Sequence, residues 1–416
     1  MGEPMRARPG RRLAADLDPA PEKTEPMMPE PTQSLSDLVE ASGVRRVDVV
    51  AWRDLDDPEA GGSEIHAHEV LSRWAAAGVD VRLWTSRVDG AAREVERAGY
   101  TACRVAGRYA VFPRTALRGL SGKIGSGDGL VEIWNGMPFL SPLWSRRPRV
   151  VFLHHVHAEM WQMVLSRAMA RVGNTIEHVV APPFYRHQPI VTLSESSKRE
   201  IVERLGLSPD QITVVPPGID ARFDGGGAKA PEPLVVTVGR LVPVKRFEWF
   251  IDAMTKLRAE YPNLQAVVVG EGYGRPALEA HARAVGAGEW LSLPGRMGDQ
   301  ELVDLYRRAW LVVSTSVREG WGMTLTEAGA CGTPAVATRI AGHEDAVSHG
   351  ESGVLVDTMD DVVTAAAAIL SDEELRARLG QGARRMAERF TWDRTALISF
   401  GVLANEAGRT RGRRAD

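Results

Sequence analysis

The sequence predicts an α/β protein made of two Rossmann-like, doubly wound domains. From residue 45 onward, short β-branched runs alternate with amphipathic stretches, a pattern typical of βαβ units and parallel sheets. The runs fall into two series, separated by a Gly- and Pro-rich segment at 224–233, DGGGAKAPEP. We expect the two domains to face each other across a cleft. Such folds bind ligands beyond the carboxyl ends of their strands, so the site is expected in loops that follow strands.

Composition excludes several classes of protein. The chain has 416 residues, 44% of them hydrophobic, and a formal net charge of -3, so no global field attracts nucleic acid. Cys103 and Cys331 are too few for a disulfide framework or a thiolate cluster and are typical of a reducing compartment. No run approaches the roughly 18 apolar residues of a membrane span, and no signal-peptide core is present. We therefore expect a cytoplasmic protein without a nucleic-acid partner.

The first domain is predicted over 35–223. Residues 1–34 are rich in Pro, Arg and Glu, so we expect a disordered tail, with Met27 or Met28 as an alternative start. The expected strands of the first sheet are 46–52, 79–85, 130–135, 149–155, 189–195 and 211–218.

The second domain is predicted over 234–390. Its expected strands are 234–240, 264–270, 290–295, 311–316 and 334–339, followed by helices at 360–370 and 372–390. The last segment, 391–416, is an amphipathic helix with a basic tail, and its apolar face must dock against another element.

Two cations follow the first strand of the second domain. Arg240 and Lys245 lie in a loop that leads into a helix, and a helix N-terminus with two cations suits a diphosphate. A pair of solvated surface charges is the alternative.

Two glutamates lie at the next strand-to-helix junction. Glu319 and Glu327 are eight residues apart, and carboxylates in such positions accept hydrogen bonds from sugar or ribose hydroxyls. The intervening glycines let the backbone approach a ligand, and the amides of the helix start point outward. The residues expected there are Gly320, Trp321, Gly322, Met323 and Thr324. Alternatively, the two carboxylates only complement the helix dipole.

Together these motifs resemble glycosyltransferase family 4, a large retaining family with the GT-B fold. The resemblance runs from about Val47 to Asp393, and its most specific part is the paired-glutamate signature E-GWGMTLT-E. By this resemblance Arg240 and Lys245 bind the donor phosphates, Glu319 contacts the donor sugar, and Glu327 contacts the ribose. The resemblance also implies that the helix at 391–407 crosses back to the first domain.

Two features of the first domain match the same family. Gly61 and Gly62 precede a helix where family members carry a Gly-rich loop near the donor phosphates, although Gly-Gly alone is usually a turn. His154 ends a strand where the family often has a histidine near the donor sugar. His155 and His157 follow, and the alternative interpretation is that these histidines bind a metal ion. Adjacent strand residues point to opposite faces, so His154 and His155 are poorly placed to share an ion.

The nucleotide base is expected near Arg296 and Met297, in the segment 292–302 that matches the family's base-binding turn. Family members often hold the base with backbone groups at this turn, so the side chains say little about which base binds. The sequence therefore does not distinguish UDP, GDP and ADP sugars. Gly270, Gly272 and Gly274 have G-x-G-x-G spacing without a clear acidic partner, which favours a tight turn over a dinucleotide site.

The resemblance implies transfer of a hexose from a nucleotide-diphosphate sugar. The expected catalytic residues are His154, Glu319, Arg240 and Lys245. The two cations stand in for the divalent ion of other sugar-nucleotide enzymes, and no DxD-type carboxylate pair is apparent, so we expect no metal and no cofactor. The acceptor stays open between a lipid-linked molecule, a glycan and a small molecule. A sugar-nucleotide epimerase and a catalytically silent binding module are the alternatives.

The segment 104–127 of the first domain has a distinct composition. It contains basic residues, no acidic ones, and interleaved apolar side chains; the basic residues are Arg104, Arg108, Arg114, Arg118 and Lys123, and the apolar ones are Tyr109, Val111, Phe112, Leu117 and Leu120. This composition suits peripheral contact with the anionic inner face of the plasma membrane. A solvated loop packed on its domain is the alternative.

Overall fold

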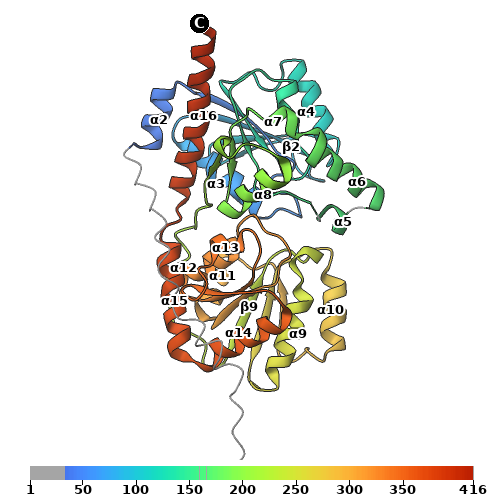
Figure 1. Cartoon of the computed structure of the whole chain (residues 1–416), viewed down its shortest axis with the longest axis vertical. Helices are drawn as coiled ribbons and strands as arrows, with labels where there is room; N and C mark the ends of the chain where they lie inside the picture. The colour runs from blue at the N-terminus through green and yellow to red at the C-terminus, as the bar shows by residue number, and fades with distance from the viewer. Residues whose placement is uncertain (1–32, 159, 165, 416) are drawn as a thin grey trace, which may run out of the picture. The chain divides into compact units, whose positions relative to one another are not determined.

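A computed structural model describes residues 33–415 except 159 and 165, and it divides into two compact units (Figure 1). One unit, here called the C-terminal unit, comprises Ile219–Phe390. The other, the N-terminal unit, comprises the described residues up to Gly218 together with those from Thr391 onward. Residues 1–32 of the expected tail lie outside the described part of the chain. Ser34 is the N-cap of the first described helix, α2 (Leu35–Ser42).

An eight-stranded sheet forms the centre of the N-terminal unit, in the order β3-β4-β2-β1-β5-β6-β7-β8. All neighbouring strands are parallel except the pair β3 and β4. The strands are β1 (Arg46–Val50), β2 (Asp80–Ser86), β3 (Glu94–Arg97), β4 (Tyr100–Ala106), β5 (Gly129–Ile133), β6 (Arg149–Phe152), β7 (Ile190–Thr192) and β8 (Ile212–Val214).

Helices cover this sheet. In Figure 1, α2 and α16 lie along one flank of the unit, and α4 and α6 lie along the other. The helices are α3 (Gly62–Ala76), α4 (Val111–Leu120), η1 (Ser141–Leu143), α5 (Met160–Val164), α6 (Arg167–Thr175), the π-helical η2 (Ile176–Val180), α7 (Pro182–Tyr185), α8 (Glu195–Leu205), η3 (Pro209–Gln211) and α16 (Trp392–Ala415).

The C-terminal unit contains a six-stranded parallel sheet in the order β11-β10-β9-β12-β13-β14. Its strands are β9 (Leu234–Val238), β10 (Gln265–Val269), β11 (Leu291–Gly295), β12 (Leu311–Ser314), β13 (Ala335–Thr338) and β14 (Gly353–Val356). Its helices are η4 (Pro243–Lys245), α9 (Phe247–Arg258), α10 (Arg275–Ala284), α11 (Asp299–Arg308), α12 (Met323–Ala330), α13 (His343–Ala346), α14 (Met359–Ser371) and α15 (Glu373–Ala387).

The last helix, α16, is part of the N-terminal unit. The Trp74 indole of α3 donates a hydrogen bond to the carbonyl of Ala396 at 2.9 Å, and the Trp74 and Phe400 rings meet edge to face. Phe400 and Leu403 are fully buried in the core beside the sheet. The apolar face of α16 therefore completes this core.

Three strands, β3, β4 and β14, were not expected from the sequence, and β4 corrects the interpretation of 104–127. Arg104 lies on β4, and its side chain is 1% exposed because it pairs with Asp54 and Asp56. Arg108 pairs with Glu59. Arg104 is therefore a buried ion-pair residue and not part of a basic surface.

The apolar half of the same segment is corrected as well. Val111 is fully buried, whereas Tyr109, Leu117 and Leu120 are exposed. The surface that remains, here called the α4 surface, consists of these three residues with Arg114, Arg118 and Lys123 on and beside α4. Among the described residues, no helix is long and apolar enough to cross a membrane.

Candidate functional site

The centre of the candidate site in the C-terminal unit is an ion pair between Lys245 and Glu319. The Lys245 ammonium lies 2.5 Å from Oε1 of Glu319, and the Ser316 hydroxyl donates to the same oxygen at 2.7 Å. Burial alone would raise the pKa of Glu319, but the Lys245 charge and these hydrogen bonds outweigh it and lower the pKa to about 2. The carboxylate is therefore ionised at neutral pH.

Arg246, which the sequence analysis missed, holds the two loops of this pair together. Its guanidinium donates to the carbonyl of Thr315 at 2.9 Å and lies over the Trp249 ring. The Thr315 hydroxyl in turn donates to the carbonyls of Lys245 and Arg246. These reciprocal bonds join the loop after β9 to the loop after β12, so Lys245 reaches Glu319 from a fixed backbone.

The loop that carries the glutamate signature needs two glycines with positive φ. Gly322 has φ 132°, and Gly342 has φ 85°. A Cβ on Gly342 would lie 2.7 Å from the carbonyl oxygen of Glu319 and from the nitrogen of Trp321. A side chain at residue 342 would therefore push the signature loop away.

His343, at the start of α13, lies beneath this loop. It is fully buried, its Nδ1 is 2.8 Å from the Thr338 carbonyl oxygen, and its Nε2 is 3.3 Å from the Ser314 hydroxyl. Burial lowers the pKa of His343 to about 4. It is a neutral structural link between the ends of β12 and β13. A lone glycine and a lone histidine give no local sequence signal for these roles.

The helix α12 begins at Met323. The first amides of a helix have no partner within it, so the backbone N–H groups of Met323 and Thr324 are available to an anion or a hydroxyl. Gly320 and Trp321 are buried, and Trp321 packs edge to face on Phe390 with ring centroids 5.1 Å apart. Trp321 is thus a support for the helix start.

Glu327 lies on α12, facing α11. The Tyr306 hydroxyl donates to its Oε2 at 3.4 Å. Burial raises the pKa of Glu327 to about 7, although Tyr306 acts in the opposite direction. The structure therefore gives the two signature glutamates contrasting electrostatic settings, one with an ammonium partner and one with a phenol.

Arg240 follows β9 in a loop shaped by glycines. A Cβ on Gly270 would lie 1.9 Å from the Gly239 carbonyl oxygen, and one on Gly272 would lie 2.4 Å from that of Leu241. The Leu241 amide also donates to the Glu271 carbonyl at 2.9 Å. The G-x-G-x-G spacing thus allows the loop after β10 to pack against the backbone that carries Arg240.

Arg296 and Met297 lie between β11 and α11. Arg296 is exposed, and Met297 is partly buried against a core cluster that includes Leu234 and Val236. The structure gives neither residue a contact with Lys245 or Glu319.

In the N-terminal unit, Gly61 and Gly62 form the start of α3. The Gly61 amide donates to the Glu64 carboxylate at 2.8 Å, and Arg53 pairs with the same carboxylate. The Gly-Gly turn is therefore fixed by a buried ion pair.

His154 lies just beyond β6 and contacts His66 of α3. Both are buried, with ring centroids 4.7 Å apart in an edge-to-face arrangement, and the His66 ring also meets Trp392 of α16. Burial lowers the pKa of His66 to about 4 and that of His154 well below its ordinary value. Both imidazoles are neutral at neutral pH, and His66 is a partner that sequence reasoning missed.

His155 and His157 take a different direction from His154, as alternation along an extended chain predicts. Their rings stack with centroids 4.9 Å apart. The Glu177 carboxylate accepts hydrogen bonds from the amides of His157 and Ala158 and from the Trp161 indole. Within the described ranges, no three His, Cys, Asp or Glu side chains are grouped as a metal ion would require.

The sequence matches two family models that together span most of both units. Residues 60–223 match Glycosyltransferase Family 4, and residues 219–386 match Glycosyl transferases group 1. A D-inositol 3-phosphate glycosyltransferase of Salinispora arenicola is 32% identical over 412 residues, covering 84% of this chain and 90% of that protein. Its counterpart in Thermobispora bispora is 30% identical, covering 82% and 90%.

Solved structures share the fold. Sucrose-phosphate synthase from Thermosynechococcus elongatus has a TM-score of 0.74 at 20% identity, covering 86% of this chain and 98% of that one. HepE from Anabaena, solved with UDP and glucose, has a TM-score of 0.67 at 16% identity, covering 87% and 100%. With these matches, and with the two parallel-sheet units and the paired-glutamate loop described above, the chain belongs to glycosyltransferase family 4 and has the GT-B fold.

Proposed function

We propose that this glycosyltransferase moves a hexose from a nucleoside-diphosphate sugar to a hydroxyl acceptor with retention of anomeric configuration and without a metal ion. The Lys245–Glu319 pair carries this proposal, because it puts a cation and an ionised hydrogen-bond acceptor side by side beyond the carboxyl ends of β9 and β12. The cation suits the diphosphate, and the carboxylate suits the sugar hydroxyls.

The nucleotide is proposed to lie along α12. Its phosphates would contact Lys245, Arg240 and the N–H groups of Met323 and Thr324, where the helix dipole favours negative charge. Its ribose would contact Glu327, which lies farther along the same helix. HepE, the neighbour solved with UDP and glucose, supports a nucleotide donor for this fold.

The proposed reaction breaks the bond between the anomeric carbon and the phosphate oxygen, and forms a bond from that carbon to the acceptor oxygen on the same face. The acceptor proton passes to the departing phosphate oxygen. Lys245 and Arg240 stabilise the negative charge that grows on the diphosphate. His154, a neutral imidazole, is proposed to contact the donor sugar, and Gly61 and Gly62 its phosphates.

The acceptor is proposed to be held at a membrane. The α4 surface keeps exposed basic residues, such as Arg114 and Lys123, beside the exposed apolar residues Leu117 and Leu120. This combination suits the headgroup region of an anionic leaflet. The relatives named for D-inositol 3-phosphate supply the contrasting case of a small polar acceptor.

The test is a panel of UDP, GDP and ADP sugars incubated with EDTA, first without acceptor and then with either D-inositol 3-phosphate or a lipid extract in vesicles. We expect slow donor hydrolysis without acceptor and a product of unchanged anomeric configuration by NMR. Inversion at a sugar carbon of the intact donor would identify an epimerase. Donor binding by calorimetry with neither hydrolysis nor transfer would identify a silent binding module.

A further inference from the structure

The exposed apolar side chains of this protein are concentrated on one part of the N-terminal unit. Of the twelve large apolar side chains exposed among the described residues, ten lie on α4, η1, α5, α6, η2 and α7 or directly beside α4, and the other two are Ile65 and Tyr273. Six of the ten form what is here called the α5–α7 surface: Met163, Met169, Val172, Val179, Val180 and Phe184. A concentration of this kind marks an interaction site.

The elements that carry these side chains are packed in a continuous row. Helix α6 packs against α5 and η2, and α7 packs against η2 and η1. Next to η1, the Trp144 ring lies directly against Gly119 of α4. Figure 1 places α4 and α6 on the flank of the unit opposite α16. The α5–α7 surface therefore continues the α4 surface.

The exposed charges have a single sign in three described segments of this row, 104–127, 136–148 and 166–187. Between residues 166 and 187 the exposed charged residues are Arg167, Arg171 and Arg186, and the one acidic residue, Glu177, is fully buried. The segments 104–127 and 136–148, which include α4 and η1, contain no acidic residue. In these three segments, the described residues place exposed apolar groups among arginines without an exposed carboxylate, which matches an anionic lipid surface. Two copies of the protein would oppose arginine to arginine across a symmetric interface, which disfavours self-association.

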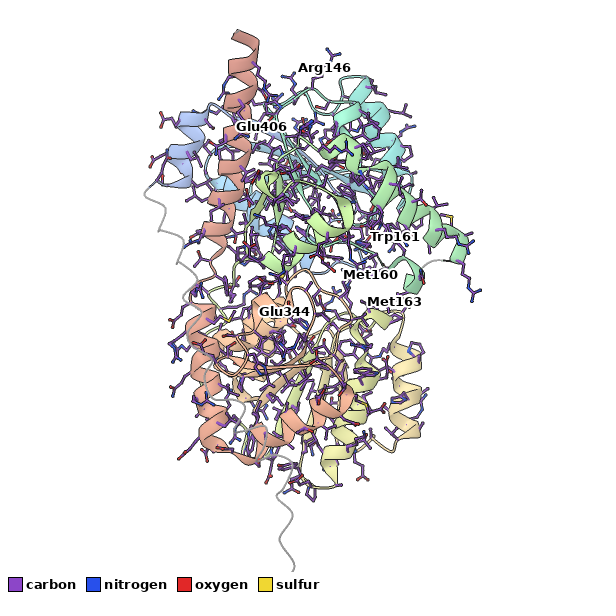
Figure 2. All side chains as sticks on the ribbon, in the orientation of Figure 1. Arg146, Met160, Trp161, Met163, Glu344 and Glu406 are labelled. Carbon is purple, nitrogen blue, oxygen red and sulfur yellow. The ribbon has the colours of Figure 1, made fainter. Side chains whose placement is uncertain are left out.

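A π-helical turn sets the orientation of these side chains. In η2 the Ala181 amide bonds to the Ile176 carbonyl at 2.8 Å, which is the wider i to i+5 spacing. Glu177 points inward to the backbone of His157 and Ala158, whereas Val179 and Val180 are 66% and 43% exposed. The exposed turn is thereby joined to the loop that directly follows His154. Figure 2 labels Met160, Trp161 and Met163, which lie together on α5 at the end of this loop.

We propose that the α5–α7 surface is a second membrane-binding element, which inserts Val179, Val180 and Phe184 into an anionic bilayer while Arg167, Arg171 and Arg186 contact lipid phosphates. It deepens the proposed function, because it locates the lipid beside the loop of His154. Membrane binding by the α4 surface alone would not bring that loop to the lipid.

The test is co-sedimentation of the full chain with vesicles of phosphatidylglycerol and phosphatidylcholine in equal parts, and with vesicles of phosphatidylcholine alone. We expect binding to the anionic vesicles that weakens with salt, because the Debye length is about 8 Å at physiological ionic strength. Val179→Ser/Val180→Ser and Arg167→Ser/Arg171→Ser should each reduce the partition coefficient about tenfold or more. The four replaced side chains are exposed, so the fold should persist, as circular dichroism would verify.

Matched variants separate chemistry from position. Val179→Leu/Val180→Leu and Arg167→Lys/Arg171→Lys should retain binding, and Arg283→Ser, on the surface of α10 in the other unit, should leave it unchanged. Equal binding by the serine variants would overturn the proposal, as would binding equally strong to neutral vesicles. A concentration-dependent dimer abolished by the valine variant would assign the surface to a second copy instead. Donor hydrolysis measured on the same proteins tests the proposed transferase activity separately, so either proposal can fail without the other.

Discussion

The ammonium of Lys245 and the carboxylate of Glu319 neutralise each other at 2.5 Å, 74 positions apart in the chain. Both partners are mostly buried, with 19% of each side chain exposed. A diphosphate that binds Lys245 must therefore share the cation with Glu319, and a sugar hydroxyl that binds Glu319 must share the carboxylate with Lys245. The pair keeps each group charged and oriented before a ligand arrives.

Removing either cation should weaken donor use without unfolding the protein. A charge-assisted contact with phosphate contributes about 1.5 to 3 kcal/mol, so Arg240→Ala and Lys245→Ala should each lower kcat/KM for the donor by roughly tenfold to more than a hundredfold. Steady-state kinetics of donor hydrolysis measure this effect. Lys256→Ala, which removes an exposed ion pair with Asp360, is the control and should change nothing. Unchanged kinetics in both site variants would remove the phosphate assignment.

The two glutamates should separate in their effects. Glu319→Gln should lower kcat about tenfold to a hundredfold while the affinity for the free nucleoside diphosphate is retained, because the lost contact is with the sugar. Glu327→Ala should weaken binding of the free nucleoside diphosphate as well. Calorimetry with the diphosphate and kinetics with the intact donor distinguish the two. The opposite pattern would mean that the roles are exchanged.

Nucleotide binding should depend on pH through Glu327. Its pKa rises from an ordinary 4.5 to about 7 in the folded protein, and ribose hydroxyls donate best to the ionised carboxylate. Affinity for the free diphosphate should therefore fall as pH drops below about 7, with proton release on binding at that pH. Calorimetry in buffers of different ionisation enthalpy measures the released proton. A wild-type affinity that does not vary between about pH 6 and 8 would contradict this assignment.

The same shift predicts an effect on stability. A raised folded-state pKa means that the protonated form is favoured in the native state, so this stabilisation is present below about pH 4.5 and is lost as pH rises through about 7. Glu327→Gln, which cannot ionise, should gain melting temperature over wild type at about pH 8 and gain little at about pH 5. An equal difference at both values would argue against a protonated Glu327.

His66 should position His154, and its replacement should test that role. Neither ring nitrogen of His66 has a hydrogen-bond partner among the described residues, and its pKa is lowered from 6.5 to about 4. A depressed histidine pKa gives stability that is present above pH 6.5 and is lost toward pH 4, by roughly 1.4 kcal/mol per unit. His66→Phe keeps the ring contact and should remove this acid sensitivity.

Kinetics of the same variant address function. If His66 orients His154 by edge-to-face packing, His66→Phe should retain kcat, whereas His66→Ala should lower it without changing affinity for the free nucleoside diphosphate. His154→Phe is the reference for loss of the sugar-facing imidazole. A kcat for His66→Ala equal to that of the wild type would mean that His66 only packs in the core and does not position His154.

Activity should persist in EDTA, since two cations and a helix start provide the positive charge for the departing diphosphate. Donor turnover is measured before and after chelation. Full loss restored by magnesium or manganese would refute metal independence.

The sequence predicted much of the fold because strand periodicity and the glycine linker are local signals. It did not predict β4, and it assigned Arg104, which lies on that strand, to the basic segment 104–127. The carboxylates that neutralise Arg104, Asp54 and Asp56, lie about fifty positions earlier and leave no local trace. The pattern of charges along the sequence does not show which carboxylates pair with an arginine in the folded protein.

The residues of the candidate site remain predictions, and they differ in how far the sequence alone indicates them. The paired-glutamate signature named Glu319 and Glu327 because their spacing is local. Arg246 and Gly342 act through contacts with residues that are distant in the chain or fixed by a turn, so their types alone carried no signal. The contrast between a pKa of about 2 and one of about 7 for the two glutamates required the positions of Lys245 and Tyr306.

Helix α16 imposes an order on biosynthesis. It contributes Ala396, Phe400 and Leu403 to the core beside the first sheet, although the whole of Ile219–Phe390 is translated in between. During synthesis, the helix that covers the α3 side of the first sheet is translated only after the whole C-terminal unit. The core of the first-made unit can therefore be completed only after residue 390 has been translated, and we expect a nascent chain arrested before residue 391 to expose that apolar face to chaperones.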